Sequence, residues 1–142
     1  MKISARYIFQ GTITEVKPGS VNSEVDVAIG GSDKIVAIVT NGSVQKLGLA
    51  AGRAATVLIK ASSVLVMTDS AGITLSARNI LAGVVSKVHN GPVSSEIAIA
   101  LPSGSTVHAT ITHDAVNDLG IKEGAAASAV FKASAVILGV PA

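Results

Sequence analysis

The sequence has no cysteine and no tryptophan, and only one tyrosine and two phenylalanines among its 142 residues. Without cysteine there is no disulfide framework, no cysteine-ligated zinc or iron–sulfur site and no thiol nucleophile. Tyr7, Phe9 and Phe131 are too few to form the stacking platform that binders of single-stranded nucleic acid use. These absences exclude several enzyme and binding classes.

Strong charge and long apolar runs are lacking as well. The net charge is +2, far below the basic footprint of a duplex-DNA binder, although a small anion stays possible as a partner. No stretch approaches 18 consecutive apolar residues, and the N-terminal segment lacks the apolar run of a signal peptide. We therefore expect a soluble cytoplasmic protein with no nucleic-acid or membrane partner. The hydrophobic fraction of 49% suffices for a packed core.

What the chain does have is an internal repeat. Shifted by 72 positions, the sequence aligns with itself without a gap from Ser4 opposite Ser76 to Val64 opposite Val136. The matches recur along the whole length, and the segment 68–72 between the copies is polar and contains glycine, as short linkers do. The repeat predicts two tandem modules, residues 1–68 and residues 73–142.

Each module is predicted to be mainly β. Val25, Val27 and Ile29 alternate with smaller or more polar neighbours, which is the period of a strand with one buried face. Further strands are expected at 8–17, 34–40, 54–60 and 62–67, and at the positions 72 residues later. The stretch after Thr40, and its counterpart after Thr112, has helical spacing and is predicted to form a short helix closed by Gly52 or Gly124. Five strands with a helix between the third and fourth are the element order of an OB-type barrel, so we expect two tandem OB-like, all-β barrels.

The end of each copy is apolar on both faces. The runs 57–67 and 129–140 therefore predict strands that are covered on both sides. A module of under 70 residues is marginally stable alone, so a second module or another subunit is the expected cover. An oligomer is favoured, and a monomer whose two copies pack on each other is the alternative.

Residues for catalysis do not stand out. The three histidines, His89, His108 and His113, all lie in the second copy, so a site built on them would exist in only half of a near-symmetric protein. The one repeated acid, Glu24 and its counterpart Glu96, is interpreted as shaping a turn or a subunit contact. Because a catalytic site needs a nucleophile with a base, a carboxylate pair or a metal cluster, we expect a protein that is not an enzyme.

Small hydroxyls and single cations do repeat. Ser-Ala-Arg stands at 4–6 and 76–78, Lys-Ala-Ser stands at 60–62 and 132–134, and Thr40 and Thr112 each precede a predicted helix. Arginine, lysine and hydroxyl groups supply many hydrogen-bond donors and few acceptors, which suits a compact oxyanion. The alternative is that the cations lie at barrel edges, where they discourage strand-to-strand aggregation.

The second copy resembles the Mop module of the molbindins, which is also called the TOBE domain. The resemblance rests on SARNILAGVV at 76–85, GPVSSE at 91–96 and LGIKEG at 119–124, and it extends in weaker form over the first copy. Members of that family are small cytoplasmic proteins that bind molybdate and tungstate. A chain made of two such modules is similar to a di-Mop molbindin, and the resemblance implies molybdenum storage and homeostasis.

The resemblance also implies an assembly and a set of ligands. Six modules around a three-fold axis correspond to a homotrimer of tandem chains, with oxyanions at interfaces between modules and no organic cofactor or protein ligand to the metal. The implied oxyanion-binding residues are Ser4, Ala5, Arg6, Thr40, Ser43, Lys60, Ala61, Ser62, Ser76, Ala77, Arg78, Asn79, Thr112, Lys132, Ala133 and Ser134. A second class of site is implied at Gly19, Val21, Ser23, Gly91, Val93 and Ser95. Ala115 stands where the first copy has Ser43, so one site is expected to lack a hydroxyl.

Two other functions stay open at this stage. The chain could be a regulatory module that responds to molybdate and acts in trans on a transporter or a transcription factor. An OB-type nucleic-acid binder is the other alternative, which the few aromatic residues and the low charge disfavour.

Overall fold

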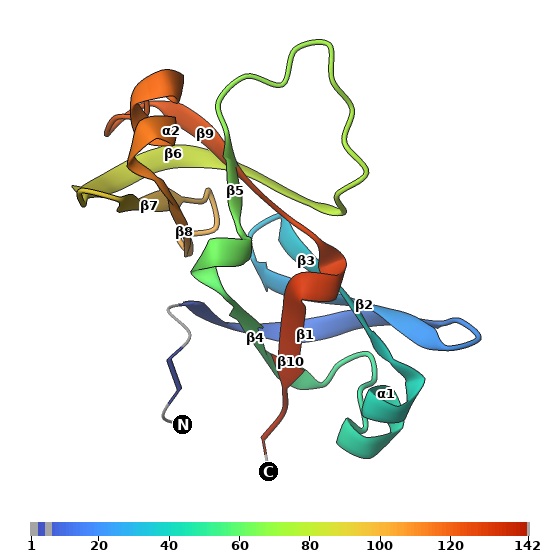
Figure 1. The fold of residues 1–142 in the computed structure, drawn as a ribbon. Coiled ribbons are helices and arrows are strands. Elements are labelled where there is room, and N and C mark those ends of the chain that lie inside the picture. Colours follow the sequence, from blue (N-terminus) through green and yellow to red (C-terminus); the bar gives the residue numbers. More distant parts are fainter. Residues whose placement is uncertain (1–2, 5–6, 142) are drawn as a thin grey trace.

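The computed structural model describes residues 3–4 and 7–141, and in these it has ten β-strands and two short α-helices (Figure 1). The first copy contains β1 (Tyr7–Pro18), β2 (Asn22–Gly30), β3 (Asp33–Thr40), α1 (Asn41–Leu47), β4 (Ala54–Ile59), the 3-10 turn η1 (Ala61–Ser63) and β5 (Leu65–Met67). The second copy contains β6 (Asn79–Asn90), β7 (Ser94–Ala100), β8 (Thr106–Thr112), α2 (His113–Leu119), β9 (Ala126–Phe131), η2 (Ala133–Ala135) and β10 (Val136–Gly139). The predicted element order and the two OB-like units are confirmed.

The two copies exchange their last strands. The strand order is β10-β4-β1-β2-β3 in one sheet and β5-β9-β6-β7-β8 in the other. Val136 of β10 pairs with Ile59 of β4, and Leu65 of β5 pairs with Val130 of β9, both antiparallel. In Figure 1 the red β10 accordingly lies beside β4, and the green β5 lies beside β9. Each five-stranded sheet therefore contains one strand from the other copy.

The exchanged strands are shorter than the sequence pattern predicted. The expected strands 62–67 and 134–139 begin only at Leu65 and Val136, because η1 and η2 come first. In these turns the N–H of Ser63 donates to the carbonyl of Lys60 at 2.9 Å, and the N–H of Ala135 donates to that of Lys132 at 3.0 Å. These backbone bonds turn the chain away from its own sheet and toward the other copy.

The two helices lie where they were predicted but end earlier. They end at Gly48 and Gly120, and not at Gly52 and Gly124 as predicted. Gly48 and Gly120 adopt the left-handed conformation, with φ of 64° and 63°. A residue without a Cβ takes that conformation at little steric cost, which is why glycine is common at this position. Among the described residues, no helix is long and apolar enough to cross a membrane.

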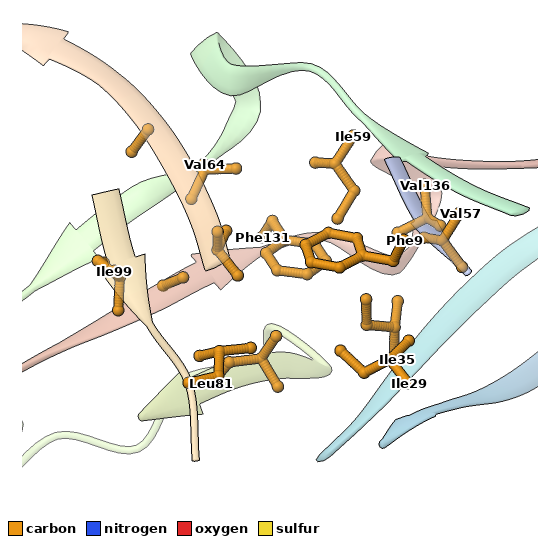
Figure 2. Packing of buried hydrophobic residues seen from close by; sticks show 14 of the residues in the cluster. Phe9, Ile29, Ile35, Val57, Ile59, Val64, Leu81, Ile99, Phe131 and Val136 are labelled. Carbon is orange, nitrogen blue, oxygen red and sulfur yellow. The ribbon is translucent and has the colours of Figure 1, made fainter. Parts of the chain in front are cut away.

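The two copies share one hydrophobic core. Phe9 from β1 and Phe131 from β9 belong to the same buried cluster, which Figure 2 shows from close by. The apolar run in β4 is buried at Val57, Leu58 and Ile59 in succession, as the two-faced pattern predicted. Strand exchange and a common core thus join the halves into one packing unit.

Candidate functional site

Two equivalent cavities bring together the repeated cations and hydroxyls. We call the first the Arg78 cavity, and it has a volume of about 270 Å³. Its lining consists of Ile38, Ser76, Ala77, Arg78, Lys132, Ala133 and Ser134. The second, the Lys60 cavity, has a volume of about 390 Å³ and is lined by Ile3, Ser4, Leu58, Ile59, Lys60, Ala61, Ser62, Thr110 and Ile137. Ala5 and Arg6 lie outside the described residues.

The elements explain why residues 54 positions apart in each copy meet. The Lys-Ala-Ser motifs form η1 and η2, with Lys60 and Lys132 as the residues that precede each turn. Strand β3 packs against η2, and β8 packs against η1, so each motif faces the opposite copy. The facing residues are Ile38 of β3 and Thr110 of β8, which occupy equivalent positions in the two copies. The cavities therefore lie at junctions between the copies.

Arg78 is held by an acid from the first copy. Its Nη1 donates to Oε1 of Glu24 at 2.5 Å, and Nζ of Lys17 lies 3.4 Å from Oε2 of the same carboxylate. The Arg78 hydrogen bond, and after it the Lys17 contact, lowers the pKa of Glu24, although burial acts in the opposite direction. The Glu24 bond in turn raises the pKa of Lys17. Glu24 lies within β2 and not in a turn, and it forms a contact between the copies.

Asn79 has a structural role that the sequence did not reveal. Its side chain is buried, its Oδ1 accepts from the N–H of Val36 at 2.8 Å, and its Nδ2 donates to the carbonyl of Val36 at 2.8 Å. The side-chain amide is thus engaged by the backbone of β3, and the predicted contribution of Asn79 to oxyanion binding stays a prediction. The bonds link the Ser-Ala-Arg segment of the second copy to the first.

Thr40 and Thr112 cap the two helices. The Oγ1 of Thr40 accepts from the N–H of Ser43 at 3.1 Å and donates to the Oγ of Ser43 at 2.9 Å. In the second copy Oγ1 of Thr112 accepts from the N–H of Ala115, whose side chain has no hydroxyl. Capping hydroxyls satisfy N–H groups that a helix leaves unpaired at its start, so part of their hydrogen-bonding capacity is already used.

Thr40 and Ser43 lie next to the Arg78 cavity and not among its lining residues. They line a separate cavity of about 370 Å³, which shares Ile38 and Ser134 with the Arg78 cavity. Thr112 is not among the residues that line the Lys60 cavity, and Thr110 of the same strand lines it instead. Sequence reasoning missed Ile38 and Thr110, although each lies two residues before a predicted threonine and hence on the same face of its strand.

The residues predicted for a second class of site form the tips of two hairpins. The side chains of Val21 and Val93 are 70% and 80% exposed. Ser23 and Ser95 are buried, and their hydroxyls donate to the side chains of Asn41 and Asn90. Gly19 closes its turn with a backbone bond from its N–H to Asn22, and Gly91 stands at the equivalent turn. Their role in anion binding stays a prediction.

Two of the three histidines meet at another cavity. His89 and His108 line a cavity of about 230 Å³ together with Lys87, Glu96 and Ala98, and Nδ1 of His108 lies 3.3 Å from Oε1 of Glu96. His113 is the first residue of α2. Over residues 3–4 and 7–141, no group of three or more histidine, aspartate or glutamate side chains could hold a metal ion. The Arg78 and Lys60 cavities instead bring together lysine, arginine and serine side chains, which are hydrogen-bond donors.

Comparison with known proteins agrees with this arrangement. The TOBE domain family model matches residues 3–66 and 75–138. A crystal structure of the cytoplasmic molybdate-binding protein ModG with molybdate bound superimposes with a TM-score of 0.96. It is 52% identical, and the match covers 99% of this chain and 100% of that one.

Longer relatives match over the same region. The molybdenum transport protein ModE of Herbaspirillum seropedicae is 44% identical over 140 residues, and the molybdenum-pterin-binding protein MopA of Rhodobacter capsulatus is 38% identical over 141. Each match covers 99% of this chain but only 52% or 53% of the relative, so the chain spans about half the length of these curated proteins. Because two successive domain matches cover most of its length, the chain belongs to the TOBE domain family.

Proposed function

We propose that this chain is a cytoplasmic binding protein that takes up molybdate, or tungstate, as an intact oxyanion for molybdenum storage and homeostasis. The observation that carries the proposal is the meeting of Ser76, Arg78, Lys132 and Ser134 in one cavity between the copies. The likeness to the molybdate-bound ModG structure over the whole chain supports it. The equivalent Lys60 cavity provides a second place for an anion.

The binding mechanism follows from the shape and charge of the ligand. Molybdate is a tetrahedral dianion whose oxygens accept hydrogen bonds, so the protein needs donors and no ligand atom for the metal. A hydrogen bond to a charged group contributes about 1.5–3 kcal/mol, and a cavity with six to eight donors would support micromolar or tighter binding after the ordering cost. Cavity size would select against smaller anions such as sulfate.

Self-association is part of the same proposal. The exposed Val21 and Val93 project from equivalent hairpin tips and offer apolar surface that another copy can cover. A homotrimer in which residues 1–68 and 73–142 each contribute a module would cover these surfaces. The proposed partners are the oxyanion and further copies of this chain, with no nucleic acid, membrane or catalysed reaction.

A regulatory role in trans is the second candidate. It is favoured by the ModE relatives, in which the matching region is about half of a longer protein; one of them, from Escherichia coli, is a DNA-binding transcriptional dual regulator. Affinity capture from a cell extract with and without molybdate separates the two functions. A storage protein retains the same partners in both samples, whereas a regulator gains or loses a specific protein when the anion is present.

Calorimetry together with native mass spectrometry tests the main proposal. We expect molybdate to bind with a Kd in the micromolar range or below, sulfate to bind at least tenfold more weakly, and the bound mass to correspond to intact oxyanions. Equal affinity for sulfate and molybdate at the same concentration would contradict the selectivity, and no molybdate binding would contradict the proposed function itself.

A further inference from the structure

Glu24 lies behind the Arg78 cavity on a different copy from Arg78 itself. It is paired across β2 and β3 with Ile38, and directly opposed residues of an antiparallel pair point to the same face of the sheet. Ile38 lines the Arg78 cavity, so the Glu24 side chain rises from the sheet beside it. Only 13% of that side chain is exposed, whereas the Arg78 side chain is 53% exposed.

The contact between Glu24 and Arg78 uses one end of the guanidinium group. A single nitrogen, Nη1, bonds to Oε1, and a guanidinium carries five N–H donors in a planar fork. The remaining donors belong to a side chain that is half exposed and that lines the cavity. An arginine fixed at one nitrogen loses less rotamer freedom when an anion binds at the others, which favours binding.

A second cation keeps the local charge positive. Lys17 lies 3.4 Å from Oε2 of Glu24, so two cations surround one carboxylate, and Lys132 adds a further positive charge to the cavity. Asn79, the residue after Arg78, is fixed to the backbone of Val36 by two hydrogen bonds. Two contacts with the first copy therefore fix the position of Arg78. The side chain of the adjacent Asn79 bonds to the backbone of Val36, and the guanidinium of Arg78 bonds to Glu24.

We propose that Glu24 is a positioning residue for oxyanion binding: it fixes Arg78 from the opposite copy so that the free guanidinium N–H groups face the cavity. This inference rests on the proposed function. It adds that the acid assists binding of an anion despite its own negative charge. The Lys60 cavity gains nothing from Glu24.

Residue-specific titration by NMR tests the role. Molybdate is added to the full chain, and the backbone amides of Ala77 and Ser134 report the Arg78 cavity, while those of Ala61 and Ser62 report the Lys60 cavity. For Glu24→Ala we expect about tenfold weaker binding at the first pair of amides and no change at the second, which is the size of effect that orienting partners have at ligand sites. Glu24→Asp keeps the charge but retracts the carboxylate, and we expect a similar loss.

Two further variants separate position from charge. Glu24→Gln keeps an oxygen that accepts from Arg78 and removes the negative charge, so it should bind at least as tightly as the unaltered chain. Glu15→Ala is the matched control: Glu15 contacts the same Lys17 at 3.6 Å, and it should leave both cavities unchanged. If Glu24→Ala does not fold, the contrast between Glu24→Asp and Glu24→Gln decides the question.

The outcomes distinguish this inference from the proposed function. Unchanged or tighter binding by Glu24→Asp, or a loss in Glu24→Gln equal to that in Glu24→Asp, would overturn the positioning role while molybdate still binds the unaltered chain. No shift at either pair of amides in the unaltered chain would overturn the proposed function.

Discussion

The Arg78 cavity and the Lys60 cavity have the same plan but differ in the residues around it. Both contain a Lys-Ala-Ser turn and face a strand of the opposite copy, yet the facing residue is the apolar Ile38 in one and Thr110 in the other. Behind the Arg78 cavity Glu24 is paired with Lys17, whereas its counterpart Glu96 contacts His108. The duplication thus kept the donors on the turns and changed their neighbours, which is where a difference in affinity would arise.

Removing a large side chain from the common core should have the largest effect on stability. It should destabilise both copies together. Phe131 is 1% exposed, and we expect Phe131→Ala to lower the free energy of unfolding by about 3–5 kcal/mol. Because the copies share a core and exchange strands, chemical denaturation should show one transition. Two separate unfolding transitions, of which Phe131→Ala displaces only one, would contradict the shared core. The surface variant Lys122→Ala is the control and should leave the transition unchanged.

Removing one lysine should weaken molybdate binding in one cavity and leave the other unchanged. Lys132→Ala should weaken molybdate binding in the Arg78 cavity about 10–100-fold, the equivalent of one charged hydrogen bond, and Lys60→Ala should do the same only in its own cavity. The amide titration above measures both cavities, and thermal denaturation without anion should be unaltered. A variant that weakened both cavities equally would mean that they do not act as separate sites.

Asn79→Leu tests a link that only the second copy contributes. The change leaves the N–H and the carbonyl of Val36 without their present partners, so we expect the free energy of unfolding to fall by about 1–3 kcal/mol. Thermal and chemical denaturation measure the effect. Asn117→Ala on exposed α2 should change stability by less than about 0.5 kcal/mol, and an equal effect of the two variants would remove the assigned role of Asn79.

Exchanging the two facing residues should make the molybdate affinities of the two cavities more alike. Ile38→Thr adds a hydroxyl beside the Arg78 cavity, and about 1 kcal/mol for a hydrogen bond corresponds to roughly fivefold tighter binding. Thr110→Ile should weaken the Lys60 cavity by a similar factor. If titration shows no change in either variant, the facing strand contributes shape only.

The smallest expected effect is on thermal stability at acid pH. The pKa of Glu24 is lowered from its ordinary value of 4.5 by Arg78 and Lys17, so its contribution to stability is present above about pH 4.5. That contribution is lost as the pH falls through the lowered pKa of the folded state. Melting temperatures between pH 3 and 7 should therefore fall less steeply at the acid end for Glu24→Gln than for the unaltered chain, and parallel curves would contradict the assignment.

The repeat predicted the fold well because strand periodicity and turn glycines are local signals. It predicted the helix starts at Thr40 and Thr112. The resemblance to the Mop module, and not the repeat, implied that Ser76 approaches Lys132, although these two residues lie far apart in the chain. Strand exchange was not predictable, since two similar copies offer β5 two similar partner strands, and in the structure it pairs with β9 of the other copy. The structural role of Asn79 and the place of Ile38 in a cavity were missed for a related reason: their neighbours come from the other copy.

A crystal structure with molybdate, measured with X-rays near the molybdenum absorption edge, would locate the bound anions. We expect anomalous density for molybdenum between Ser76, Arg78 and Lys132, and a second peak beside Ser4, Lys60 and Ser62. Molybdenum peaks that avoid both cavities would contradict the assignment of the repeated cations and hydroxyls as the oxyanion sites.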